Sequence, residues 1–97
     1  MREHHYYVYV LTNKIHTCFY IGVTNDLINR LSQHANKNNI NSFTAKYNIN
    51  KLVYYEQYQY IQDAIQREKE LKGWKQHKKI ELIKSKNSNF IDLGKDF

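Results

Sequence analysis

Apolar and aromatic residues occur in short runs whose spacing predicts the order of the elements. Three runs rich in β-branched and aromatic residues are typical of strands, at Tyr6–Leu11, Cys18–Val23 and Lys51–Glu56. Apolar residues at helical spacing begin at Leu27 and Ile61, and a third group surrounds Ile80. The order β-β-α-β-α-α predicts a mixed α/β fold, a small three-stranded antiparallel sheet flanked by helices, in which the first two strands form a hairpin.

Local signals place the element ends. Asn25 and Asp26 are expected to cap the first helix, and Gly73 to end or bend the second. The asparagine-rich stretch 36–50 has no period and is expected to be mostly loop, with Phe43 and Tyr47 packing it onto the domain. The apolar stripes of the first two helices are predicted to be Leu27, Ile28, Leu31 and Ala35, then Ile61, Ala64, Ile65, Leu71 and Trp74.

Length and composition narrow the class of protein. The chain has 97 residues, so we expect a single domain over 1–97. No proline and only three glycines exclude collagen-like and linker-like chains. No apolar run can span a membrane, and the N-terminus lacks a secretory signal pattern. Because the single cysteine, Cys18, cannot form a disulfide within the chain, we expect a reduced, cytoplasmic protein.

The positive charge is concentrated in one stretch. Lys and Arg number 15 against 9 Asp and Glu, a net charge of +6. Residues 67–86 hold eight of the cations and three glutamates, so this stretch carries a net charge of +5. Such a face suits a polyanion such as nucleic acid, although a lysine-rich helix facing only solvent is a common alternative.

Glu68 breaks the apolar stripe of the second helix. It occupies a position that helical spacing directs inward, between Ile65 and Leu71. An inward carboxylate is costly unless it is paired, protonated or bound to a metal. A salt bridge, or a stripe that widens to the surface at this turn, would also explain it.

Polar groups suited to phosphate chemistry occur in the first helix and in the hairpin. Arg30 and His34 share one helix face, and arginine offers a planar fork for phosphate. Tyr7 and Tyr9 share one face of the first strand, and Tyr20 precedes Gly22 by two residues. A glycine inside a strand indicates a bulge or a close approach to the backbone. Each feature alone is equally typical of packing or of an ordinary surface.

Taken in order, these residues resemble the GIY-YIG nuclease family, in its small single-domain form related to the N-terminal domain of the UvrC excision-repair nuclease. Tyr7-Val8-Tyr9 stands where the family has GIY, and Tyr20-Ile21-Gly22 is the YIG element. Arg30, ten residues after Tyr20, matches the family arginine, and His34 matches a further polar position. Glu68 matches the metal-binding glutamate and Asn87 an asparagine of the small members. The resemblance extends over about residues 6–93.

Three positions depart from the family pattern. Tyr7 replaces the glycine of GIY, Val23 stands where UvrC-type domains have a lysine, and Ser88 replaces the usual proline. The last two favour an alternative function, a non-catalytic nucleic-acid-binding module of the same fold. A third possibility is an interaction domain whose basic face binds an acidic protein.

The resemblance implies a metal-dependent DNA endonuclease, structure-selective or non-specific, with DNA repair or recombination as its setting. One Mg²⁺ or Mn²⁺ would be held by Glu68, and Arg30 would stabilise the scissile phosphate. Tyr9 is favoured as general base with Tyr20 as its partner, although the sequence does not separate the two. His34 completes the implied catalytic set. Substrate binding is assigned to Tyr7, Gly22, Lys72, Lys75 and Asn87. DNA is the expected partner, together with a targeting protein, while the oligomeric state is left open.

Overall fold

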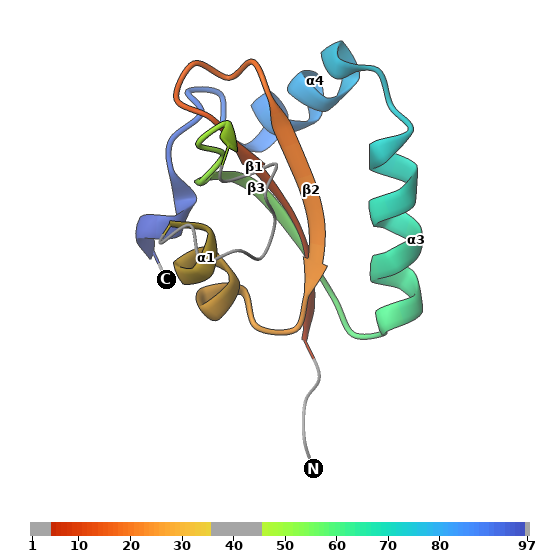
Figure 1. The fold of residues 1–97 in the computed structure, drawn as a ribbon. Coiled ribbons are helices and arrows are strands. Elements are labelled where there is room, and N and C mark those ends of the chain that lie inside the picture. Colours follow the sequence, from red (N-terminus) through yellow and green to blue (C-terminus); the bar gives the residue numbers. More distant parts are fainter. Residues whose placement is uncertain (1–4, 36–45, 97) are drawn as a thin grey trace.

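The computed structural model describes residues 5–35 and 46–96. Three strands form one antiparallel sheet in the order β2-β1-β3: β1 (Tyr6–Thr12), β2 (Phe19–Thr24) and β3 (Lys51–Tyr58). Within the described residues four helical segments accompany it: α1 (Leu27–Ala35), α3 (Ile61–Lys72), α4 (Gln76–Lys86) and the short 3-10 helix η1 (Leu93–Asp96). Figure 1 shows α1 and α3 on opposite sides of β2. The predicted fold class, element order and hairpin are confirmed.

Both faces of the sheet are covered, because successive residues of a strand point to opposite faces. On one face Val8 and Val10 pack with apolar residues from α3 and α4. On the other face Tyr9 and Leu11 pack with Leu27 of α1. The central strand β1 therefore holds the two cores together, and its four central residues are buried.

A register shift divides the pairing of β1 with β3. Val10 pairs with Tyr54, but the next residue, Leu11, pairs with Leu52, so Val53 is the extra residue of a bulge. Beyond the bulge β3 alternates regularly, and Tyr54, Glu56 and Tyr58 lie on the face that α3 covers.

The helices begin and end where the sequence predicts. The backbone N–H of Asn29 donates to Oδ1 of Asp26 at 3.2 Å, so Asp26 caps α1. Gly73 is the C-cap of α3. The predicted stripes are partly wrong, because Ile28 and Ile65 are 62% and 40% exposed. Each helix buries a narrower stripe than its apolar sequence predicts, and α3 buries only Ala64 and Leu71.

The segment that leads into β3 packs through a different residue than expected. Phe43 lies outside the described residues, and Tyr47 is exposed rather than packed. Ile49 is completely buried instead and joins the core beneath α1. Within the described ranges, no helix is long and apolar enough to cross a membrane.

Candidate active site

The ring of Tyr9 lies directly over Gly22. The two residues are opposite each other in the β1–β2 ladder. A Cβ atom added to Gly22 would lie 2.5 Å from the Tyr9 hydroxyl oxygen and 2.6 Å from its ring carbon Cζ. The close approach predicted at this glycine is therefore made by Tyr9. Because β2 is the edge strand, the missing side chain lets the phenol extend toward the edge of the sheet.

Replacement of Gly22 by alanine is expected to destabilise the fold. Tyr9 is only 2% exposed, so its rigid ring cannot move aside without disturbing the core. Overpacking of this kind costs about 1–3 kcal/mol, or roughly 4–15 °C in Tm for a domain of this size. Thermal unfolding followed by circular dichroism measures the change.

Gly73→Ala is the matched control for that substitution. A Cβ at Gly73 would meet its nearest neighbour, the Glu70 carbonyl oxygen, at 3.5 Å, which is an ordinary contact. Its φ of −79° suits any residue, so alanine should leave the Tm unchanged or slightly raised. Equal Tm values for Gly22→Ala and wild type would show that the Tyr9 ring is not fixed over Gly22.

Tyr9 and Tyr20 form a pair on this face of the sheet. Their ring centroids are 6.2 Å apart with an interplanar angle of 46°. Burial raises the pKa of the Tyr9 phenol well above its ordinary value, and the neighbouring Tyr20 hydroxyl, which shares a hydrogen bond with it, raises the pKa further. The resting form of Tyr9 is thus the protonated phenol.

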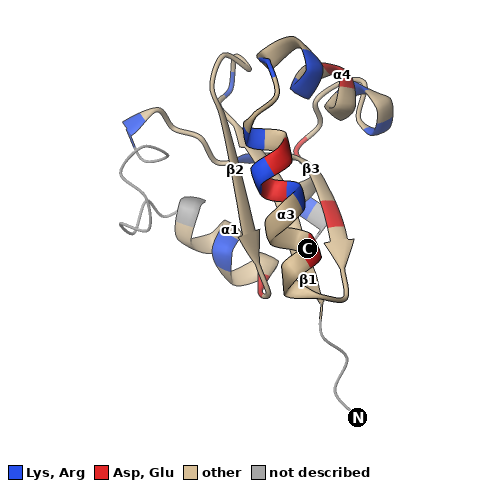
Figure 2. Cartoon of the chain, turned by 90° about the vertical axis from the view of Figure 1, so that its right-hand side faces the viewer, with Lys and Arg blue, Asp and Glu red and all other residues tan. Residues whose placement is uncertain are grey.

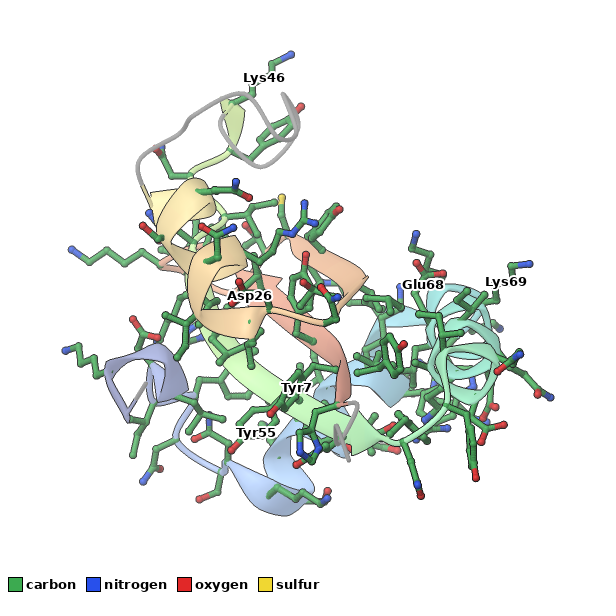
Figure 3. The ribbon with its side chains drawn as sticks, turned by 90° about the horizontal axis from the view of Figure 1, so that it is seen from below. Tyr7, Asp26, Lys46, Tyr55, Glu68 and Lys69 are labelled. Atoms are coloured by element: carbon green, nitrogen blue, oxygen red, sulfur yellow. The ribbon has the colours of Figure 1, made fainter. Side chains whose placement is uncertain are left out.

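Arg30 and Glu68 act on the same phenol from two different helices. The positive charge of Arg30, on α1, lowers the pKa of Tyr9, whereas the negative charge of Glu68, on α3, raises it. Tyr20, Arg30 and Glu68, from β2, α1 and α3, are therefore each close enough to Tyr9 of β1 to shift its pKa. Figure 3 shows the sheet between α1 and α3, with Glu68 on α3.

Glu68 lies at the border of the buried face of α3. Its side chain is 20% exposed, and the ammonium of Lys72, one turn later, is 3.3 Å from its Oε2. Lys72 is half exposed, so this ion pair is weak and readily rearranged. The side chain that the sequence predicted to point inward is thus partly exposed, and the Glu68 carboxylate remains accessible to a cation from solvent.

The other predicted residues lie in different settings. The ring of Tyr7 is edge-on to Tyr55 at 6.1 Å, and Figure 3 shows the two together. Lys75 is exposed at the N-cap of α4. His34 belongs to α1, but its side chain lies outside the described residues.

Asn87, which the resemblance assigns to substrate binding, has its side-chain amide bound within the fold. Its amide nitrogen donates to the carbonyl oxygens of Val53 and Ile91, at 3.0 and 2.8 Å. Its Oδ1 accepts the backbone N–H of Ile91 at 3.0 Å. Both amide hydrogens and the oxygen are engaged by backbone groups, so Asn87 joins the chain after α4 to β3.

The donor set limits the kind of metal that could bind. Among the described residues there is no group of three or more His, Cys, Asp or Glu side chains able to hold an ion. A single carboxylate, Glu68, remains. This set does not suit zinc or calcium, but it fits Mg²⁺ or Mn²⁺, because Mg²⁺ keeps several waters and takes one or two carboxylates plus substrate phosphate.

A second polar cluster lies on the opposite face of the sheet, where sequence reasoning found nothing. Arg67 of α3 donates to Glu56 of β3 through Nε and Nη2, each at 3.0 Å. The hydroxyls of Tyr54 and Tyr58 donate to the same carboxylate at 2.5 and 2.6 Å. The signal was the alternation of Tyr54, Glu56 and Tyr58, which gives a strand one polar face.

The titration of this cluster reflects its hydrogen bonds. Burial raises the pKa of Glu56, but hydrogen bonds from Arg67, Tyr54 and Tyr58 outweigh burial and hold the pKa below its ordinary value. Burial and the bond to Glu56 raise the pKa of Tyr58 to about 12. The cluster is therefore an ion pair with two neutral phenols at neutral pH.

Comparison with known proteins gives a family and a similar fold. The family model described as the GIY-YIG catalytic domain matches residues 5–81. The solution NMR structure of a UPF0213 protein from Bacillus halodurans is similar in fold, with a TM-score of 0.58 and 26% sequence identity. The match covers 91% of this chain and 92% of the Bacillus chain. No curated protein gave a significant match.

Proposed function

The chain belongs to the GIY-YIG family of catalytic domains, and from this premise we propose that it is an endonuclease that hydrolyses phosphodiester bonds of DNA. The observation that supports the proposal is that one tyrosine, one arginine and one glutamate, from three further elements, all influence the Tyr9 phenol. A packing role explains a buried tyrosine, but it does not explain why an arginine and a partly open carboxylate approach the same phenol.

Arg30 is assigned to the scissile phosphate. Its guanidinium stays charged at any working pH and can donate two parallel hydrogen bonds to phosphate oxygens. Negative charge on those oxygens grows as the phosphorus is attacked, so a fixed cation stabilises the transition state more than the ground state.

Glu68 is assigned to a divalent ion, Mg²⁺ or Mn²⁺, and such an ion, when bound, supplies Lewis-acid stabilisation of the leaving 3′ oxygen. Nucleases of this family generally depend on a divalent metal. Lys72 would release the carboxylate as the cation arrives, because their ion pair is exposed and loses little when water replaces it. Lys72 is then free to contact a neighbouring phosphate.

The tyrosine pair is assigned to the attacking water. Tyr9 is favoured as the group that takes the proton, with Tyr20 as its hydrogen-bond partner. Burial holds the proton on Tyr9 in the resting protein, while Arg30 opposes that effect. A bound cation adds positive charge, which favours the phenolate, whereas the phosphate charge and the exclusion of water oppose it. The balance of these effects decides how much of the reactive phenolate forms.

The cleavage rate is therefore expected to rise with pH. A phenol has an ordinary pKa of about 10, and burial raises that of Tyr9, so log(kcat/KM) should increase between pH 6 and about 9 without a plateau. Stopped-time cleavage of an oligonucleotide at saturating Mn²⁺ measures the profile, and Tyr9→Phe should remove most of the rise. A plateau reached near pH 7 would point to a histidine instead.

The basic face is assigned to the DNA backbone. Figure 2 shows Lys and Arg positions in blue along α3 and α4. Lys75 is the N-cap of α4, and Lys78 lies in its first turn. Such contacts position a duplex without reading its sequence, and no base-reading element is evident among residues 5–35 and 46–96. The preferred substrate is therefore assigned to DNA shape, such as a flap, junction or nick, or to delivery by a partner protein, in repair or recombination.

The experiment that tests the proposal compares cleavage with binding on one panel of DNA. Supercoiled plasmid, a flap and a four-way junction are incubated with the protein at low salt, with Mg²⁺, with Mn²⁺ or with EDTA. Cleavage that requires a divalent ion supports the endonuclease. Salt-sensitive binding without cleavage of any substrate would favour the non-catalytic binding module, which is the alternative that the departures at Val23 and Ser88 suggest. Failure to bind DNA at low salt would contradict both.

A further inference from the structure

The Glu56–Arg67 cluster holds α3 on the sheet through hydrogen bonds that also fix the orientation of the helix. The Arg67 fork meets both oxygens of Glu56, and each oxygen also accepts one tyrosine hydroxyl. Trp74 covers the guanidinium, with its ring 5.3 Å away. A paired fork of this kind has one favourable orientation, whereas an apolar contact tolerates sliding and rotation.

The apolar contacts of α3 define its orientation poorly. Only Ala64 and Leu71 are buried along its twelve residues. These two side chains are seven residues apart and lie on the same side of the helix. Their contacts therefore do little to prevent the helix from rotating about its axis. The helix nevertheless has to present Glu68 toward Tyr9 of β1 and Tyr20 of β2.

Arg67 and Glu68 are consecutive residues, so the same turn of helix carries both. Consecutive side chains are separated by about 100° around the axis. The Arg67 side chain reaches Glu56 of β3, at one edge of the sheet. The next side chain, Glu68, points toward β1 and β2, where it acts on Tyr9. Any rotation or shift of α3 that loosens the Arg67 fork therefore moves the Glu68 carboxylate.

The Glu56–Arg67 pair is less exposed to solvent than the pair that Arg67 forms with Glu70. The side chains of Arg67 and Glu56 are 21% and 14% exposed. Glu70, the other partner of Arg67 at 2.7 Å, is 49% exposed. Shielded, charge-assisted bonds hold geometry more firmly than solvated ones.

We propose that the Glu56–Arg67 pair, completed by Tyr54 and Tyr58, is a positioning device that fixes α3 so that Glu68 lies beside Tyr9, Tyr20 and Arg30. Arg67 and Glu56 are positioning residues and do not contact the substrate. This inference rests on the proposed function, because it assigns Glu68 the role of metal ligand.

Three variants test the proposal. Arg67→Lys keeps the charge but loses the fork, and Glu56→Gln removes the carboxylate. Both should weaken Mn²⁺ binding about tenfold, as the loss of supporting groups around metal ligands does. Both should lower kcat by about 100-fold with little change in KM for DNA, because a displacement of about 1 Å has that effect. Glu70→Gln is the matched control, since it removes only the exposed partner of Arg67, and should behave as wild type.

Binding is measured without reference to activity. Mn²⁺ is titrated into ¹⁵N-labelled protein, and the broadening of backbone amide signals near Glu68 gives the affinity of the site. Circular dichroism melts identify a temperature at which every variant is folded. If Glu56→Gln does not fold, Arg67→Lys and Tyr58→Phe, which removes one bond to Glu56, carry the test.

The outcomes separate the inference from the proposed function. Glu68→Gln should abolish the local broadening; if it does not, Glu68 is not the metal ligand and the proposed function is wrong. If Glu68→Gln loses binding while Arg67→Lys binds and cleaves like wild type, the function stands and the positioning role is overturned. Equal losses in Glu70→Gln and Arg67→Lys would also overturn it, because the shielded pair would then have no special role.

Discussion

Glu68→Gln is expected to reduce DNA cleavage by at least about 10³-fold. The neutral amide keeps the shape of the side chain but cannot replace the carboxylate that the proposal assigns to the divalent ion. A bound cation contributes several kcal/mol of transition-state stabilisation, and each 1.36 kcal/mol corresponds to tenfold in rate. Nicking of supercoiled plasmid measures the loss. Glu81→Gln, which removes an equal charge from α4, should cleave like wild type.

The same variant is expected to remain folded. Glu68 is partly open to solvent, and its ion pair is with the half-exposed Lys72. Such pairs contribute about 0–1 kcal/mol, so the Tm should be unchanged or slightly higher. A Tm lowered by many degrees would mean that Glu68 is a structural residue, and the lost cleavage would then say nothing of a metal.

Arg30→Ala is expected to lower kcat by about 10²–10³-fold while changing DNA affinity little. Removal of one preorganised donor to a developing oxyanion has an effect of this size. The physical reason is that the guanidinium is required most when charge accumulates on the scissile phosphate. Single-turnover cleavage gives the rate, and fluorescence anisotropy in Ca²⁺ or EDTA gives the affinity.

A lysine on the basic face provides the contrast for Arg30. Lys78→Ala on the exposed surface of α4 should weaken DNA binding and reduce the dependence of the affinity on salt concentration. The cleavage rate at saturating protein should be unchanged. Equal losses of rate and affinity in Arg30→Ala would reduce Arg30 to an ordinary phosphate contact.

The strands and helix ends that were predicted from local sequence patterns are present in the structure. Tyr6–Leu11 and Cys18–Val23 were predicted as a hairpin within one residue of the observed strands, because β-branched and aromatic runs separated by a polar turn have few alternatives. Asp26 and Gly73 mark helix ends through their own chemistry. Gly22 was recognised as a position of close approach, and the Tyr9 ring over it is the physical reason.

The parts that were not predicted depend on contacts distant in sequence. Glu56 and Arg67 appear in the sequence only as two charges eleven residues apart, and their pairing requires the β3 bulge and the docking of α3. The helical stripes were overestimated at Ile28 and Ile65, because periodicity gives a direction but not how much of a helix the sheet covers. Asn87 was assigned by resemblance to the site, but its amide is bound by backbone groups.

The central claim is that Glu68, Arg30 and the tyrosine pair form one hydrolytic site. The most direct measurement is plasmid nicking by wild type and Glu68→Gln side by side, each with Mn²⁺ and with EDTA, on samples shown to have the same Tm. The account predicts nicking by wild type with Mn²⁺ alone and none by Glu68→Gln. Nicking by both proteins, or nicking that persists in EDTA, would contradict it.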